Sequence, residues 1–181
     1  MALRPRCVLQ ANADEVSVDS QHLLRSRPAL LQDSPFLPMN SNEVQRAQLG
    51  MKQFHAQKAA GKDLCDWQDL VVHVGDQPCL HAGKCKWLTW SAVSRCLPTL
   101  RRSSGLYVAT AKCRQITLHE LYSAMGFPTL GFCAQAAGVR LYSIDRDNFT
   151  YWQCRNALGN SQHVANVGSV MLAALSCATY K

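Results

Sequence analysis

Residues 114–128 read Arg-Gln-Ile-Thr-Leu-His-Glu-Leu-Tyr-Ser-Ala-Met-Gly-Phe-Pro, and this stretch predicts a short helix with both ends marked. Thr117 and Glu120 have the spacing of a capping box, in which the hydroxyl and the carboxylate each bond a backbone N–H. Gly126 can adopt the left-handed conformation that ends a helix, and Pro128 prevents its continuation. The face predicted to be buried carries four apolar side chains at helical spacing: Leu118, Leu121, Tyr122 and Met125.

The same block resembles a conserved motif of the DNA (cytosine-5) methyltransferases. Its pattern Arg-x-Ile-Thr-x-x-Glu, followed after a gap by Gly-Phe-Pro, is similar to the ninth block of that family, usually Arg-x-Leu-Thr-x-Arg-Glu-x-x-Arg-Leu-x-Gly-Phe-Pro. Residues 156–164, Asn-Ala-Leu-Gly-Asn-Ser-Gln-His-Val, resemble the tenth block, a Gly-Asn-Ser/Ala-Val turn that opens the last helix. Residues 96–101, Cys-Leu-Pro-Thr-Leu-Arg, are a weaker likeness to the strand that precedes the ninth block.

The resemblance implies a partial α/β or α+β fold of short β-hairpins and helices, like the target-recognition and C-terminal parts of a methyltransferase. It suggests a reduced target-recognition-like region at 43–94 and a C-terminal methyltransferase-like segment at 95–181. Residues 1–42 are expected to form a poorly ordered arm, because three prolines between 28 and 38 leave room for no more than one helical turn, at 22–27.

The family also implies S-adenosyl-L-methionine as the cofactor. Asn160 and Ser161 would then lie near its pocket, because a turn and a helix N-terminus suit a carboxylate. Gln162 and His163 stand where the family usually has Val directly after Ser or Ala. This departure is typical of a divergent, protist branch and weakens the assignment of a cofactor contact.

Several parts that catalysis in this family requires are not found in the sequence: a Phe-x-Gly-x-Gly cofactor turn, a Glu-Asn-Val block and a Gln-x-Arg-x-Arg block. The Pro-Cys-Gln nucleophile loop has a degenerate counterpart in Pro78-Cys79-Leu80. Cys79 is a weak candidate nucleophile, since a thiolate must add to the cytosine ring, but a chance likeness is the preferred interpretation. We therefore expect a C-terminal, DNA-associated fragment that is not catalytic alone and whose partner is the N-terminal catalytic half.

The net charge of +7 is unevenly distributed. Residues 77–140 contain eight basic residues and one acid, so this segment carries the whole excess. Lys and Arg in such numbers suit a nucleic-acid backbone, and Arg101, Arg102 and Lys112 are the candidate phosphate contacts. A solvated cationic face, or a charged hairpin edge that discourages aggregation, explains the same residues. A small basic, non-enzymatic nucleic-acid-binding module is therefore the alternative function.

Nine scattered cysteines form no Cys-x-x-Cys pair, and their odd number leaves one unpaired in any disulfide scheme. With no signal peptide at the N-terminus, reduced and mostly buried thiols are expected in an intracellular protein, with the nucleus as one location for it. No apolar run reaches the roughly 18 residues that a membrane span needs, so no membrane partner is expected.

A zinc site is also weighed. Cys79, His81 and Cys85 have the spacing Cys-x-His-x-x-x-Cys, which fits no common zinc knuckle. A fourth ligand would have to come from elsewhere in the chain: Cys65, His73 or Cys96. The sequence therefore also allows a metal-stabilised interaction domain or a poorly folding fragment, and no metal is assigned.

Periodicity and turn residues predict the remaining elements. A helix is expected over 41–61, capped by Ser41 or Asn42 and ended by Gly61. The last helix follows the turn Gly159-Asn160-Ser161, and its many small residues predict that it is buried between layers. The remaining expected elements are strands at 70–74, 87–90, 106–109 and 139–144 and a helix over 129–138.

Overall fold

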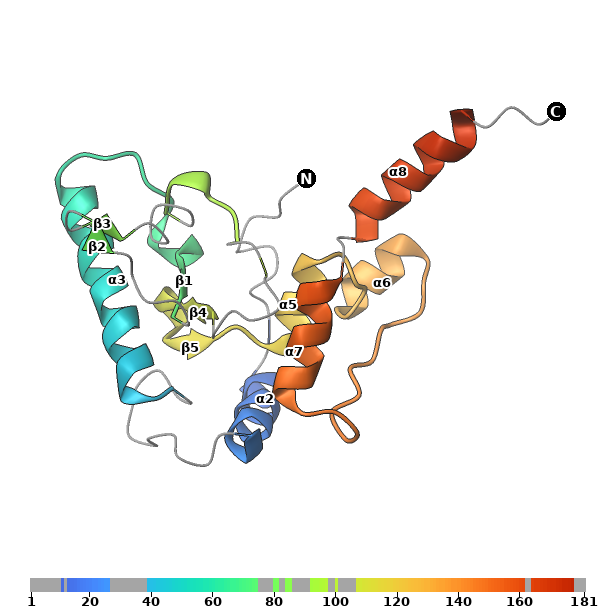
Figure 1. The fold of residues 1–181 in the computed structure, drawn as a ribbon, viewed down its shortest axis with the longest axis horizontal. Coiled ribbons are helices and arrows are strands. Elements are labelled where there is room, and N and C mark those ends of the chain that lie inside the picture. The colour runs from blue at the N-terminus through green and yellow to red at the C-terminus, as the bar shows by residue number, and fades with distance from the viewer. Residues whose placement is uncertain are drawn as a thin grey trace.

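The computed structural model shows a mixture of helices around a small antiparallel sheet (Figure 1). This α+β architecture confirms the coarse prediction of helices with short strands, and the likeness to a methyltransferase fold stays a prediction. None of the helices within the described part of the chain is both long and apolar enough to cross a membrane. The structure describes residues 11, 13–26, 39–74, 80–81, 84–85, 92–97, 100, 107–161 and 164–177.

The central sheet has the strand order β1-β4-β5 and is antiparallel throughout. Strands β1 (Val71–His73) and β4 (Tyr107–Ala109) are buried along their whole length, as expected for β-branched and apolar runs in a core. The strands β1 and β4 confirm the predictions at 70–74 and 106–109. Strand β5 (Arg114–Gln115) follows a tight turn in which Cys113 has a positive φ of 48°. A second hairpin pairs β2 (Leu80–His81) with β3 (Lys84–Cys85).

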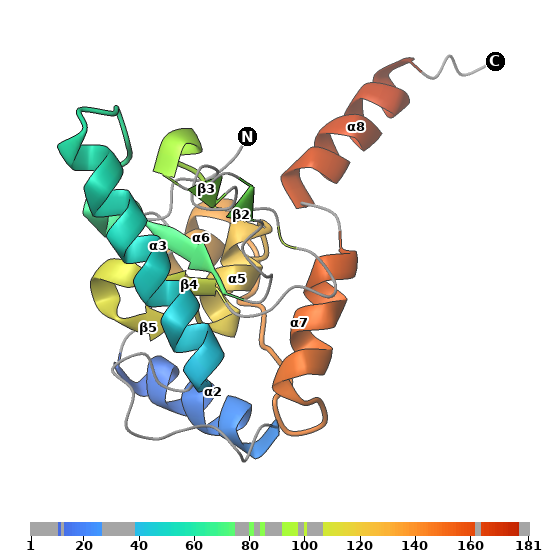
Figure 2. The same ribbon diagram turned by 60° about the vertical axis from the view of Figure 1, so that its left-hand side comes forward.

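Helix α3 (Ser41–Ala59) runs along one side of the sheet and contacts β1 (Figure 2). Its N-cap is Asn40, not the predicted Ser41 or Asn42, and Asn40 forms a full capping box with Glu43. Ala47 and Phe54 are buried on the face toward the sheet. Gly61 has a φ of +76° just after the helix, as the sequence predicted.

Helix α5 (Leu118–Ala124) forms as the opening stretch predicts. Thr117 is the N-cap, and both halves of the capping box with Glu120 are present. Gly126 has a φ of +85° beyond the last turn. The predicted apolar face is buried at Leu118, Leu121 and Tyr122, and Met125 packs partly buried against the same core.

Helix α2 (Ala13–Ser26) is much longer than the single helical turn expected at 22–27, so that prediction is wrong. Its inward positions include Asp19, His22 and Leu23, all buried. The sequence of α2 lacks a clear amphipathic pattern because Asp19 and His22 are polar residues at buried positions. Asp14 and Glu15 in the first turn suit the helix dipole.

Helix α7 (Tyr151–Asn160) was not anticipated. Thr150 caps it, and Gln153 completes a capping box of the same kind as the one at Thr117. That spacing of Thr and Gln is a signal that the sequence contained. Gly159 and Asn160 belong to the last turn of α7 and Ser161 is its C-cap, so the prediction of a tight turn at Gly159-Asn160-Ser161 is wrong.

The expected strand at 139–144 is wrong. Residues 140–145 carry no regular secondary structure, and no described strand pairs with them. The N–H of Tyr142 bonds the carbonyl of Pro128 at 2.8 Å, and the Tyr142 ring stacks on Tyr122. An alternating sequence makes a strand only where a neighbouring strand completes its hydrogen bonds. The helix expected just before it is present as α6 (Gly131–Ala137).

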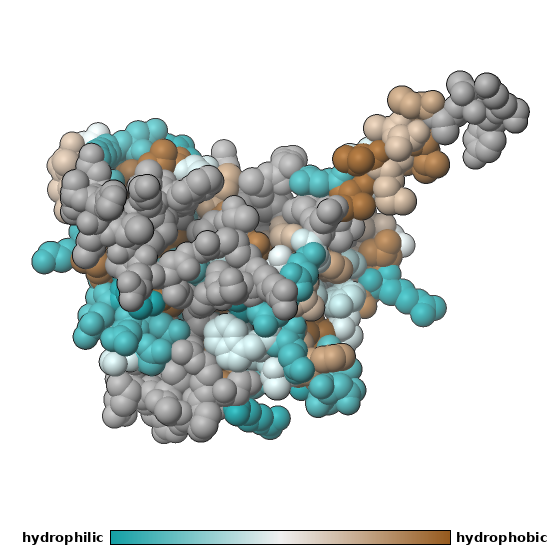
Figure 3. All heavy atoms as spheres, in the orientation of Figure 1, coloured by the Kyte–Doolittle hydropathy of each residue, from teal (hydrophilic) through white to brown (hydrophobic). Residues whose placement is uncertain are grey.

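Helix α8 (Val164–Cys177) is not buried between layers, which corrects the prediction for the last helix. It projects from the body in Figure 1, and Figure 3 shows its surface as largely hydrophobic. Val170 and Leu172 are each 69% exposed. Small residues allow a helix to be packed on several sides, but nothing in the described remainder of the chain covers this one.

Candidate functional site

The block at 114–128 is organised around one ion pair. The Arg114 guanidinium donates two hydrogen bonds to the Glu120 carboxylate, from Nη1 to Oε2 at 2.8 Å and from Nη2 to Oε1 at 2.7 Å. The same carboxylate accepts from the backbone N–H of Thr117 at 2.9 Å and of Ala11 at 3.0 Å. Glu120 is fully buried, and Arg114 and these N–H groups supply the hydrogen bonds that a buried charge requires.

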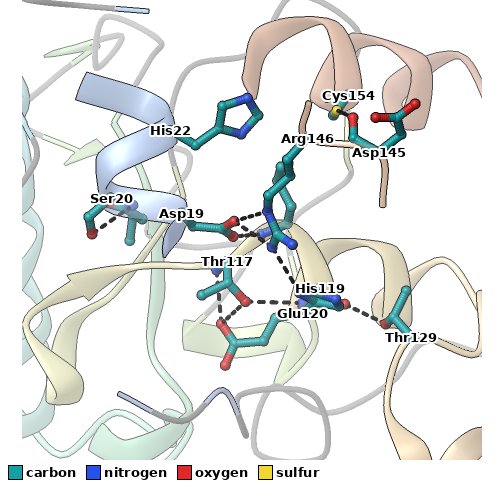
Figure 4. A network of polar contacts seen from close by, with 12 residues as sticks. Asp19, Ser20, His22, Thr117, His119, Glu120, Thr129, Asp145, Arg146 and Cys154 are labelled. Atoms are coloured by element: carbon teal, nitrogen blue, oxygen red, sulfur yellow. Dashed lines mark hydrogen bonds and ion pairs between the residues drawn. The ribbon is translucent and has the colours of Figure 1, made fainter. Parts of the chain in front are cut away.

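A second buried carboxylate meets the start of the same helix. Asp19, on α2, accepts from the backbone N–H of Leu118 at 2.5 Å and from Nε of Arg146 at 2.7 Å. Figure 4 shows Arg146 reaching between Asp19 and the α5 helix. The carboxylates of the two pairs therefore accept from the N–H groups of Thr117 and Leu118 at the N-terminus of α5, and Asp19 ties α2 to that helix.

His119 adds a neutral group to this arrangement. Nη2 of Arg146 lies 2.9 Å from Nδ1 of His119, and because arginine can only donate, Nδ1 is the acceptor. The imidazole therefore carries its proton on Nε2. Burial, helped by the adjacent Arg146 charge, lowers the pKa of His119. A neutral histidine at physiological pH follows from both observations.

The loop at 145–148 positions Arg146. Its backbone is held by Asp145, whose Oδ1 accepts from the N–H of Asn148 at 3.0 Å and of Asp147 at 3.2 Å. Hydrogen bonds from Asn148 lower the pKa of the exposed Asp145 carboxyl. The carbonyl of Asp145 faces the Cys154 thiol on α7 at 3.8 Å, so the loop is also tied to that helix.

We call these residues the polar cluster: Asp19, Arg114, Thr117, His119, Glu120 and Arg146. Its two carboxylates are both engaged by arginines, and its histidine has its Nδ1 lone pair occupied. The neighbouring groups are poor nucleophiles, because burial raises the pKa of Tyr122 to about 12 and also raises the pKa of the Cys154 thiol. The polar cluster is suited to fixing α2 and the 145–148 loop against α5, and not to acid–base chemistry.

The residues predicted for DNA contact and catalysis are placed only in part. Cys79, Arg101 and Arg102 lie outside the described residues. Lys112 is exposed in the short 3-10 turn at Thr110–Lys112, between β4 and β5. It lies two residues from Arg114, on the solvent side of the turn that leads into the polar cluster.

The two residues predicted to lie near a cofactor are at the C-terminal end of α7. Asn160 is the last residue of this helix and is exposed. Ser161 is its C-cap, and the Ser161 hydroxyl donates to the carbonyl of Leu158 at 2.7 Å. The end of α7 presents carbonyl groups, which attract cations, whereas a cofactor carboxylate needs N–H donors. The cofactor contact at Asn160 and Ser161 therefore stays a prediction, and the geometry of α7 does not support it.

Cysteine and metal chemistry receive little support in the described part of the chain. No three His, Cys, Asp or Glu side chains among those residues gather in a way that could hold a metal. Cys65 and Cys154 are buried free thiols, whereas Cys113 and Cys177 are exposed ones, so the expectation of mostly buried thiols holds only in part. Burial, with Asp69 and Asp66 nearby, raises the pKa of Cys65 to about 11.

Sequence reasoning found half of the polar cluster. The capping-box spacing connects Thr117 with Glu120, and Arg114 belongs to the same block of seven residues through the resemblance to the ninth block. Asp19 and Arg146 are 127 residues apart, and no local pattern links them. A weak signal was available at Asp19, an acidic residue placed on the apolar face of a helix.

Comparison with known proteins gives no relative: the chain matches no family model, no curated protein and no solved structure.

Proposed function

We propose that this chain is the C-terminal part of a DNA (cytosine-5) methyltransferase-like protein, associated with DNA and not catalytic alone. The observation that carries the proposal is the Arg114–Glu120 pair. Four residues shared with the ninth block of that family have structural tasks here, since Thr117 caps the helix, Glu120 binds Arg114 and Gly126 takes the left-handed conformation.

The exposed last helix is consistent with a missing partner. Helix α8 has no charged residue, and Val170, Leu172 and Leu175 are all more than 60% exposed. Apolar surface of this kind generally marks an interface. In the proposed protein, the N-terminal catalytic half covers α8 and supplies S-adenosyl-L-methionine binding.

The charge distribution supports association with DNA. The segment at 77–140 carries the chain's whole positive excess, and Lys112 and Arg140 are exposed within it. Such charge attracts phosphate through counterion release and does not depend on a cofactor.

The chain alone is expected to shift a short duplex DNA in a gel at low salt. It is also expected to transfer no label from radioactive S-adenosyl-L-methionine to that duplex. Binding without methyl transfer supports the proposal. Label on cytosine would contradict the non-catalytic part, and no shift at low salt would contradict the DNA association.

The alternative is a small basic, non-enzymatic nucleic-acid-binding module with no methyltransferase ancestry. Both proposals predict DNA binding, so the coding transcript upstream of Met1 distinguishes them. An open frame that continues into a Pro-Cys-Gln block and a glycine-rich cofactor turn supports the methyltransferase lineage. A transcript whose coding frame opens at Met1 favours the module.

A further inference from the structure

The connection between α6 and α7 has the sequence of a strand and lies on the surface. We call residues 139–143, Val-Arg-Leu-Tyr-Ser, the exposed segment, since all five are exposed and Leu141 is 58% so. In Figure 1 this connection runs along the outer edge of the molecule. An alternating, apolar and aromatic segment without a neighbouring strand is a template for pairing with another chain.

The backbone of the exposed segment is suited to such pairing. No turn or bend interrupts residues 140–145, and the N–H of Tyr142 bonds the carbonyl of Pro128 at 2.8 Å. Successive N–H groups of an extended chain point to opposite edges, so those of Leu141 and Ser143 point away from Pro128. No residue in the described part of the chain accepts from either of them. One edge is therefore attached to the body, and the other is open.

The body fixes the orientation of this open edge. The Tyr142 ring stacks on the Tyr122 ring with 5.6 Å between centroids and lies 5.2 Å from the Phe127 ring. Ile144, two residues later on the same side of an extended chain, is buried. Leu141 consequently lies on the opposite face, toward solvent.

We propose that the exposed segment is a dimerisation strand, which pairs antiparallel with the exposed segment of a second copy of this chain. The twofold axis passes through Leu141, so Val139 lies opposite the partner's Ser143. This proposal goes beyond the proposed function and depends neither on DNA association nor on a methyltransferase lineage.

The hydrogen bonds of the body select this register. The open edge presents the N–H and carbonyl of Leu141, which exchange bonds with the partner's Leu141. The N–H of Ser143 donates to the carbonyl of the partner's Val139. The N–H of Val139 is already bonded to the carbonyl of Ala134 at 3.1 Å, so Val139 contributes only its carbonyl. Twofold symmetry doubles each of these bonds.

The side chains of the exposed segment complement one another in the same register. Arg140 lies opposite the partner's Tyr142 in a pair without mutual backbone bonds, where side chains approach most closely. Tyr142 is 40% exposed, so part of its ring is accessible to that guanidinium.

A second copy therefore supplies every group that the open edge requires. It places an apolar side chain beside Leu141 and an aromatic ring beside Arg140, and no like charges face each other. An acidic peptide would match only Arg140, which is the single charge of the exposed segment. The same patch on both partners gives a closed dimer. So short an interface predicts a weak, reversible one.

The first test removes a backbone donor from the open edge. Leu141→Pro deletes the N–H on the twofold axis and suits an extended chain, whereas Leu141→Thr keeps that N–H and is the matched control. Both are made in a chain that also carries Leu172→Glu and Leu175→Glu, so that the exposed apolar surface of α8 does not contribute. Sedimentation equilibrium measures the dimer dissociation constant, and circular dichroism checks folding. We expect Leu141→Pro to weaken the dimer at least about tenfold and Leu141→Thr by less than about threefold.

The second test reads the register directly. The two Cα atoms of Leu141 would lie about 5.5 Å apart across the axis, within the range that a disulfide spans. Leu141→Cys is therefore expected to cross-link the copies through position 141 under mild oxidation, as mapped by mass spectrometry of tryptic peptides. Ser143→Cys is the control, because the two copies of that position lie about 13 Å apart along the strands and should not cross-link.

The outcomes decide the proposal independently of any nucleic acid. A folded Leu141→Pro variant that dimerises as tightly as Leu141→Thr would overturn it. A chain that is monomeric throughout once α8 carries the two glutamates would place all self-association on α8 and would also overturn it. Equal cross-linking through positions 141 and 143 would contradict the register.

Discussion

The guanidinium of Arg114 and the carboxylate of Glu120 form a two-pronged pair at 2.7 and 2.8 Å, with Glu120 fully buried and Arg114 nearly so. The two residues belong to β5 and α5, so the pair fixes the angle at which the helix leaves the sheet. A buried pair of this kind is costly to break because one charge is left without a partner.

Removing one partner of this pair should destabilise the protein strongly. Arg114→Met and Glu120→Gln are each expected to lower the free energy of unfolding by about 3 kcal/mol, and the double variant by less than their sum. Urea unfolding of the four proteins in this cycle measures the coupling. The control is Asp63→Asn, which breaks an exposed pair with Arg95 and should cost less than about 1 kcal/mol. Additive effects at Arg114 and Glu120 would contradict the account of the pair.

The cap at Thr117 should contribute a smaller amount. Thr117→Ala removes the hydroxyl that accepts from the N–H of Glu120 at 3.2 Å, and we expect a loss of about 1 kcal/mol. Thr117→Ser retains the oxygen and should recover most of that loss. Equal stability of the wild-type, Ala and Ser proteins in thermal unfolding would mean that the hydroxyl does not cap α5.

Stability should fall in mildly acidic solution through His119. Its pKa is lowered in the folded protein, so the unfolded chain binds the proton more tightly. The contribution is fully present above the ordinary histidine pKa of about 6.5, and it is lost as pH falls through the lower folded pKa. Unfolding free energies measured between pH 7.5 and 5 should show this decline.

The variant His119→Asn keeps a short side chain that can accept from Arg146, and it does not titrate. We expect it to flatten the decline with pH. His55→Gln is the matched control, because His55 is exposed on α3 and its loss should leave the decline in place. If the decline in stability persists in His119→Asn and disappears in His55→Gln, His119 is not its cause and the prediction is wrong.

Helix α8 should add nothing to the stability of the body. Leu172→Glu together with Leu175→Glu is expected to change the free energy of unfolding by less than about 0.5 kcal/mol, because both side chains are already exposed. The same variant should reduce the concentration-dependent association of copies of this chain with one another, measured by light scattering. Leu121→Ala, in the core, is the contrast and should cost about 3 kcal/mol. A large loss of stability from the α8 variant would show that the helix packs on the body.

The sequence predicted the elements whose signals are local. The capping box at Thr117, the left-handed glycine at Gly126 and the β-branched run in β1 each depend on neighbours within a few residues, and each was found where expected. The same reasoning could have found α7 from Thr150 and Gln153, which have the spacing used at Thr117.

The wrong predictions concern elements whose structure depends on which other elements pack against them. An alternating pattern at 139–144 makes a strand only if another strand lies beside it, and a small-residue helix is buried only if two layers enclose it. Asp19 shows the converse, since its partner Arg146 makes a buried acid acceptable on the apolar face of α2. Such partners are distant in sequence, so periodicity cannot reveal them.

The most direct test of the proposed DNA association is the salt dependence of duplex binding by the whole wild-type chain. Anisotropy with a 20-base-pair duplex between 50 and 200 mM salt is expected to show an affinity that falls linearly on logarithmic axes and is unchanged by added S-adenosyl-L-methionine. The absence of duplex binding at 50 mM salt, or an affinity that does not change with salt concentration, would contradict the proposed DNA association.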